Sequence, residues 1–139
     1  MKNRILKAIE ENGPEKCYLV YGKWKGAIRE GMKTPEEIAI EVQSKYPKIV
    51  ERREIDDPDD INSCIRIFTE IFLEILERFP EADVIIDFTG GTKAMSSALF
   101  YTSNIVPIRR RFYEYISGER GIDGRVISGT EKTIKMKYI

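Results

Sequence analysis

Hydrophobic and polar positions along this chain follow two spacings, one typical of helices and one typical of strands. From Ile61 to Phe79, apolar side chains recur roughly every three or four residues, which predicts a long helix with one apolar side. The run Asp83–Phe88 is rich in β-branched residues and predicts a buried parallel strand. Because helix and strand patterns alternate along the chain, the sequence predicts an α/β fold.

The other elements follow from shorter patterns of the same kinds. Thr34-Pro35-Glu36-Glu37 is a capping box with proline at the first helical position. The last apolar alternation of the chain is interleaved with lysines, which is typical of an antiparallel edge strand. We therefore expect a mostly parallel central sheet flanked by helices, with an antiparallel C-terminal edge. Further helices are expected at 1–12, 34–46 and 92–104, strands at 17–21, 48–55, 111–116 and 133–138, and a glycine-rich loop or hairpin at 117–130.

The composition bounds both the number of domains and the chemistry. A chain of 139 residues is long enough for one domain with a core and too short for two. Its 23 basic and 23 acidic residues cancel, so we expect no direct DNA binding through bulk charge. The chain has no histidine and no CxxC pair, which argues against a transition-metal site, and no cofactor is expected. The acidic cluster Asp56–Asp60 is explained by helix capping rather than by metal binding.

The cysteines and the hydropathy of the chain indicate a cytoplasmic protein. Cys17 and Cys64 fall at apolar positions, which is typical of reduced cysteines in a core. No run approaches the roughly 20 apolar residues that span a bilayer, and no signal peptide is recognisable. Association with a membrane is expected only if the chain is one domain of a longer, membrane-anchored protein.

The most informative segment is Asp87–Ser96, where the predicted strand runs into a double-glycine turn and then into a helix start. Gly90 and Gly91 allow a sharp turn and a close approach of the backbone to a ligand. Free amides and the helix dipole favour a phosphate at such a place. The spacing fits neither a Walker A loop nor a dinucleotide fingerprint, and the plainer alternative is an ordinary glycine turn. The polar side chains of this turn are Thr89, Thr92, Lys93 and Ser96.

A second candidate segment is the loop 22–33, which is basic, rich in glycine and long. Like the double-glycine turn, it leaves the carboxyl end of a predicted parallel strand. Ligands of open parallel sheets bind beyond these ends. If the two strands are neighbours, the basic loop and the turn face one crevice, and the residues alone then predict a site for a phosphorylated ligand.

The string Thr89-Gly90-Gly91-Thr92-Lys93, with Met95 and Ser96 after it, resembles the signature of CARF domains. These are the CRISPR-associated Rossmann fold domains that sense cyclic oligoadenylates in type III CRISPR defence. The resemblance implies a Rossmann-like core from Cys17 to about Tyr138 within a single domain. It also implies a homodimer that binds one ring, cyclic tetra-adenylate first among the candidates, and that controls an effector absent from this chain.

The resemblance further implies which residues contact the ring. The residues of the ligand floor are Gly90, Gly91, Thr92 and Lys93, within the motif that also holds Thr89, Met95 and Ser96. The residues of the covering loop are Gly22, Lys23, Trp24 and Lys25. Trp24 either stacks on an adenine, which is worth about 1 to 3 kcal/mol per base, or is a partly buried core residue. Residues 1–13 form either a linker stub or a helix that caps the sheet edge.

Two alternative functions stay open. Some CARF domains are ring nucleases, which cleave the ring without a metal by attack of a ribose 2′-hydroxyl on the adjacent phosphate. Lys93, Thr92 or Ser96 would then assist, and without histidine the turnover should be slow. The other alternative is a generic nucleotide-binding Rossmann-like domain, for which Arg109-Arg110-Arg111 is either a phosphate patch or a solvated loop.

Overall fold

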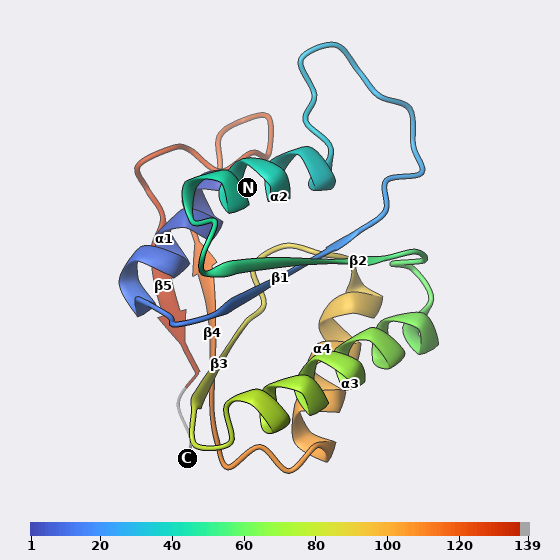
Figure 1. The fold of residues 1–139 in the computed structure, drawn as a ribbon. Helices are drawn as coiled ribbons and strands as arrows, with labels where there is room; N and C mark the ends of the chain where they lie inside the picture. The colour runs from blue at the N-terminus through green and yellow to red at the C-terminus, as the bar shows by residue number, and fades with distance from the viewer. Residues whose placement is uncertain (137–139) are drawn as a thin grey trace.

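A computed structural model describes residues 1–136 of the chain (Figure 1). The order of helices and strands predicted from the sequence is confirmed. The predicted final strand extended to Tyr138, whose position lies outside the described residues. The elements are α1 (Lys2–Asn12), β1 (Cys17–Gly22), α2 (Pro35–Lys45), β2 (Val50–Ile55), α3 (Ile61–Arg78), β3 (Asp83–Asp87), α4 (Lys93–Ile105), β4 (Arg110–Ser117) and β5 (Lys132–Lys135).

The strands pair as two separate hydrogen-bonded sheets. β1 and β2 are parallel, with Gly22 opposite Ile55 at their carboxyl ends. β3 and β4 are parallel, with Asp87 opposite Glu114, and β5 adds to β4 in the antiparallel direction. The α/β class, the parallel pairs and the antiparallel C-terminal edge are therefore confirmed. The single central sheet expected from the sequence is divided between β1 and β3.

Helices cover the strands from two sides. α3 and α4 lie side by side against one side of the strands, and α1 and α2 lie together on the other (Figure 1). On β1, Tyr18 and Val20 pack into the core that α3 and α4 close, whereas Cys17 and Leu19 pack into a smaller core with α1 and α2. Alternate side chains of β1 thus belong to two different cores, as expected for a strand covered on both faces.

Side-chain caps fix the starts of the helices as the sequence predicts. The Thr34 hydroxyl accepts a hydrogen bond of 3.2 Å from the Glu37 amide, which confirms the capping box of α2. Asp60 caps α3 by accepting hydrogen bonds from the amide and the hydroxyl of Ser63, at 3.0 and 2.7 Å. These bonds lower the pKa of Asp60. Within the acidic segment before α3, Asp60 therefore acts as the helix cap.

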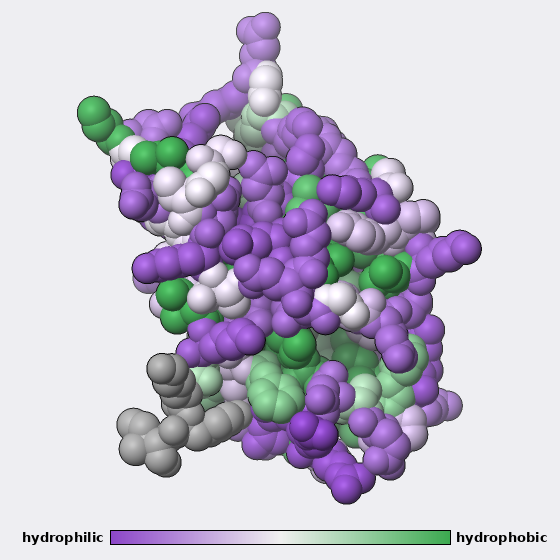
Figure 2. Space-filling view, turned by 90° about the vertical axis from the view of Figure 1, so that its left-hand side faces the viewer, coloured by the Kyte–Doolittle hydropathy of each residue, from purple (hydrophilic) through white to green (hydrophobic). Residues whose placement is uncertain are grey.

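The outer surface beside α1 and β5 is mostly hydrophilic, with hydrophobic surface gathered in its lower part (Figure 2). Ile85 and Phe112, which are register partners on β3 and β4, are exposed. α1 therefore covers only part of the second sheet.

Among residues 1–136, no helix combines the length and the apolar character needed to cross a membrane. Both cysteines are free thiols, and burial and then the charge of Asp87 raise the pKa of Cys17 to about 11.

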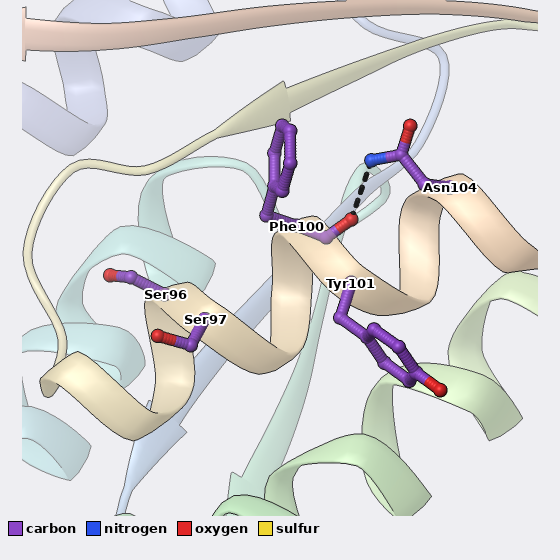
Figure 3. Close-up of a pocket in the computed structure, with 5 residues that line it drawn as sticks. All are labelled: Ser96, Ser97, Phe100, Tyr101 and Asn104. Atoms are coloured by element: carbon purple, nitrogen blue, oxygen red, sulfur yellow. Dashed lines mark hydrogen bonds between the residues drawn. The ribbon is translucent and has the colours of Figure 1, made fainter.

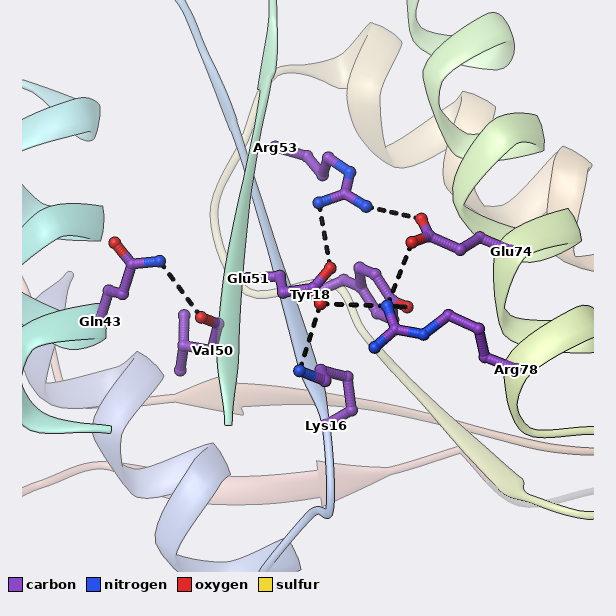
Figure 4. A network of polar contacts seen from close by, with 8 residues as sticks. All are labelled: Lys16, Tyr18, Gln43, Val50, Glu51, Arg53, Glu74 and Arg78. Atoms are coloured by element: carbon purple, nitrogen blue, oxygen red, sulfur yellow. Dashed lines mark hydrogen bonds and ion pairs between the residues drawn. The ribbon is translucent and has the colours of Figure 1, made fainter. Parts of the chain in front are cut away.

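A network of ion pairs ties β2 to α3 (Figure 4). The Glu51 carboxylate accepts hydrogen bonds from Arg78 at 3.0 Å and from Arg53 at 3.1 Å, and it pairs with Lys16 at 3.2 Å. Glu74 of α3 accepts from the same two arginines. Burial alone would raise the pKa of Glu51, but the hydrogen bonds and charges of Arg78 and Lys16 outweigh it and lower the pKa to about 2.

Replacing Glu51 by glutamine is expected to lower the free energy of unfolding at pH 7 by about 1 kcal/mol, since several charge-assisted bonds are lost from a partly exposed network in which solvent screens each bond. The depressed pKa contributes stability that is present above the usual value of 4.5 and lost as the pH falls towards about 2. Glu51→Gln should therefore lose less stability than the wild type between these pH values. Urea unfolding at pH 7 and pH 3 measures both effects. Glu77→Gln, an exposed change on α3, is the control, and equal acid sensitivity of all three proteins would contradict the assignment.

Candidate functional site

The double-glycine turn at the carboxyl end of β3 has the backbone geometry that glycine allows. Gly90 has φ +78° and Gly91 has φ +83°, both in the left-handed region. A Cβ atom at Gly90 would also collide with the side chain of Met1. Thr89 anchors the turn, because its amide donates to Asp87 Oδ1 and its hydroxyl accepts from the Ile116 amide, both at 2.7 Å. The turn is therefore held firmly from both neighbouring strands.

The turn presents a row of backbone donors at the start of α4. Within residues 1–136, the amides of residues 90–94 have no hydrogen-bond acceptor. Thr92 caps α4 by accepting from the Met95 amide at 3.1 Å, and its hydroxyl proton goes to the carbonyl of Pro58. The Thr92 hydroxyl is thus used internally, and the amides are the free donors. Such a helix start favours an anion.

Lys93 and Ser96 are the other polar side chains beside these amides. Lys93 is exposed and makes no hydrogen bond or ion pair with the described part of the chain. Ser96 is half-buried on the first turn of α4. Met95, in contrast, is buried, with Sδ 3.5 Å from the Cβ position of Gly91 and 3.6 Å from that of Gly22. Met95 therefore supports the turn from below, while Lys93 is free to contact a ligand.

Of the predicted loop 22–33, Gly22 lies at the turn, and it is the last residue of β1. A Cβ atom at Gly22 would collide with Pro58, and Gly22 also neighbours Met95. The rest of the loop extends away from the body of the molecule before it reaches α2 (Figure 1). Lys23 is exposed, and Lys25 forms an ion pair of 3.3 Å with Asp57. β1 and β3 are not hydrogen-bonded neighbours, so Gly22 and the turn meet through side-chain packing.

Trp24 belongs to the surface of this loop. Its side chain is 46% exposed, lies against Gly26, and donates from Nε1 to the Ala27 carbonyl at 3.3 Å. The indole ring is therefore a residue of the loop and not of either core. An exposed ring of this kind is available for stacking.

The arginine triplet lies away from the turn, around the amino end of β4. Arg109 pairs with Glu81 at 2.9 Å, and Arg110 pairs with Asp83 at 3.1 Å. Two of the three charges are thus neutralised by acidic residues at the start of β3 and just before it. The triplet does not add to the anion site at the carboxyl end of this sheet.

A hollow of about 520 Å³ lies along the surface of α4, directly after the turn. Figure 3 shows that Ser96 and Ser97 project from the first half of the helix and Phe100, Tyr101 and Asn104 from the second half. The Asn104 side chain donates to the Phe100 carbonyl at 2.8 Å. The hollow is shallow and partly aromatic, and it continues from the amide row onto the helix.

A second pocket, of about 200 Å³, lies at the carboxyl ends of β3 and β4. It shares Thr89 and Gly90 with the turn and adds Arg4 of α1 and Arg120 of the hairpin between β4 and β5. The sequence analysis missed both arginines. No local motif marks them, because they are brought together only by tertiary structure.

Two carboxyl groups lie behind the turn as register partners. Glu114 is 4% exposed and accepts from Asn12 Nδ2 at 3.2 Å. Asp87 Oδ2 is buried with no hydrogen-bond donor among residues 1–136. Burial first, and then the neighbouring Asp87, raise the pKa of Glu114. Asp87 in turn holds the Thr89 amide, so this pair supports the floor of the site.

Replacing Glu114 by glutamine is expected to stabilise the protein by about 1 kcal/mol at pH 8, because a neutral amide replaces a buried charge and can donate to Asp87. A raised folded-state pKa means that the stability of the wild type is fully present below the usual value of 4.5 and is lost as the pH rises through the folded-state pKa. Thermal unfolding from pH 4 to pH 8 should show a flatter profile for Glu114→Gln than for the wild type. The exposed change Glu70→Gln is the control, and a loss of stability in Glu114→Gln at every pH would contradict the prediction.

Comparisons of the sequence with protein-family models and with curated proteins found no match. No group of three or more potential metal ligands occurs in the described part of the chain. Within residues 1–136, the site offers backbone amides, the unpaired Lys93 and the Ser96 hydroxyl, which can bind an anion and stabilise charge on a phosphate.

Proposed function

We propose that this chain is a cyclic oligoadenylate sensor domain of type III CRISPR defence, with a Rossmann-like core. The single observation that carries the proposal is the double-glycine turn with its free amides and the unpaired Lys93, in a segment whose sequence resembles the CARF signature. A phosphodiester of the ring accepts from the amides of residues 90–94 and from Lys93. Trp24, exposed on the loop after β1, supplies a surface on which an adenine stacks.

In this proposal the ring is shared between two copies of the chain. Three large apolar side chains on α4 are exposed, namely Phe100, Tyr101 and Ile105, by 47%, 54% and 59%. They lie on the same helix as Lys93, about two to three turns towards its carboxyl end. A two-fold axis through this face gives an even-membered ring equivalent phosphate sites in both copies. The effector that the ring controls lies outside the chain.

The proposal is tested by titrating the purified protein with cyclic tri-, tetra- and hexa-adenylate in a calorimeter and then separating the nucleotides by chromatography. Binding of the tetra-adenylate ring at one ring per two chains, with the ring recovered intact, is the expected result. Recovery of linear products would identify the ring nuclease alternative instead. No heat with any ring would overturn the proposal and leave an anion site for a different nucleotide.

A further inference from the structure

The pocket at the carboxyl ends of β3 and β4 has a composition that sets it apart from the open turn beside it. Positive side chains from two distant segments, Arg4 on α1 and Arg120 on the hairpin, meet at one small cavity. No aspartate or glutamate is among its lining residues in the described part of the chain. Within residues 1–136, neither Arg4 nor Arg120 forms an ion pair with a carboxylate, so both keep their positive charge for a ligand.

Arg4 has a side-chain donor that no acceptor in the described structure satisfies. It is half-buried, and its Nε is inaccessible to solvent and has no hydrogen-bond partner within residues 1–136. No ion pair or other hydrogen bond of its guanidinium is formed with the described residues. A buried guanidinium N–H without an acceptor is unfavourable, and an incoming anion relieves that cost.

Arg120 is held by the hairpin that covers the pocket. Its Nη1 donates to the Gly124 carbonyl at 2.6 Å, and its backbone pairs with Val126 across the hairpin. A guanidinium carries five N–H donors, so the bond to Gly124 leaves most of them for a ligand. Gly118 lies under Val126 so closely that a Cβ atom there would collide with it. The hairpin thus holds the Arg120 guanidinium in place beside the pocket.

The rest of the pocket supplies further hydrogen-bond donors and an apolar side. The Gly90 amide and the Ser117 hydroxyl have no partner among the residues described. Phe88, Tyr115 and Val126 line the apolar side. The volume, about 200 Å³, suits one phosphoryl group and lies below the roughly 300 to 1,000 Å³ of pockets that enclose whole drug-sized ligands.

We propose that this pocket binds a dianionic phosphoryl group between Arg4, Arg120 and the amide of Gly90. The ligand is a free phosphate ion or the terminal phosphate of a nucleotide, whose remaining atoms stay outside the pocket. A phosphodiester of a ring carries one charge and no terminal phosphate, so this site is distinct in chemistry from the contacts proposed for the ring. The Gly90 amide is among the donors proposed for the ring, so a ring at the turn and a phosphoryl group in this pocket compete for that one donor, whereas Lys93 belongs to the ring site alone and the two arginines to the pocket alone.

The test is a titration of the full chain with inorganic phosphate at pH 7.5, followed by amide shifts in two-dimensional NMR. Saturable shifts are expected at Gly90, Ser117 and Gly118. Arg120→Ala should weaken the binding about tenfold or more, as should Arg4→Ala, because each removes a charge-assisted contact. Arg66→Ala removes an exposed arginine of α3 that does not line the pocket, so this variant is the matched control and should bind phosphate like the wild type.

The outcomes separate this inference from the function proposed for the turn. Lys93→Ala should bind phosphate normally even where it no longer binds a ring. Tighter binding of adenosine monophosphate than of phosphate would identify the nucleotide as the source, and equal or weaker binding would identify the free ion. Dimethyl phosphate or acetate binding as tightly as phosphate would overturn the inference, as would an unchanged affinity in Arg120→Ala. Because Arg120 is exposed on the hairpin, its replacement leaves the fold intact even if Arg4→Ala does not.

Discussion

Replacing Lys93 by alanine is expected to weaken the binding of cyclic oligoadenylate at least tenfold, or about 1.4 kcal/mol. Lys93 is exposed beside the free amides of the turn and has no ion-pair partner in residues 1–136, so its charge is available to a phosphate. For the same reason its loss leaves no buried group unpaired, and the thermal stability should change little. Calorimetric titration with the tetra-adenylate ring measures the affinity.

Lys48→Ala is the matched control for this variant. Lys48 is also exposed and unpaired in the described structure, but it precedes the amino end of β2, whereas the site lies beyond the carboxyl ends of the strands. It should bind the ring like the wild type. Equal affinity of Lys93→Ala and the wild type would remove Lys93 from the site.

Replacing Gly91 by alanine is expected to reduce ring binding by more than tenfold, because alanine disfavours the backbone conformation that orients the free amides of the turn. Gly91 has φ +83°, a conformation that costs an alanine roughly 1 to 2 kcal/mol. Space is not the obstacle, since an added Cβ would lie at an ordinary 3.5 Å from Met95. The strain therefore acts on the backbone donors themselves. Calorimetry gives the affinity and thermal unfolding gives the stability.

Gly13→Ala separates loss of stability from loss of the site. Gly13 has φ +52° at the C-cap of α1, and an added Cβ would meet nothing within 4 Å. The two variants should therefore lose similar stability, whereas only Gly91→Ala should lose the ring. Parallel loss of ring binding in both variants would mean that general destabilisation, and not the turn, controls the affinity.

Local patterns in the sequence were enough to predict the elements and the turn. The capping box at Thr34 and the double glycine are determined by residues that are adjacent in the chain, so their geometry follows from short-range sterics and hydrogen bonds. The resemblance to CARF domains rests on the same local segment. Predicting these features did not require knowing which strands are neighbours.

The arrangement in space was harder to predict. The division into two sheets depends on pairing between distant strands, which periodicity does not encode. Arg4 and Arg120 are more than a hundred positions apart and meet only after folding. The sequence likewise could not reveal that the Thr92 hydroxyl donates its proton to the carbonyl of Pro58.

In the function that we propose, the bond from Thr92 to Pro58 connects the ligand site to the start of α3. One hydroxyl both caps the helix that follows the glycine turn and holds the segment that leads into α3. A ligand that moves the first turn of α4 must therefore strain or relax the start of α3. Suppose that ligand binding at the turn changes the affinity of a partner protein for the start of α3 by some factor. Thermodynamic reciprocity then requires that binding of this partner change the ligand affinity of the turn by the same factor. The two ends of this single bond are thus coupled input and output positions.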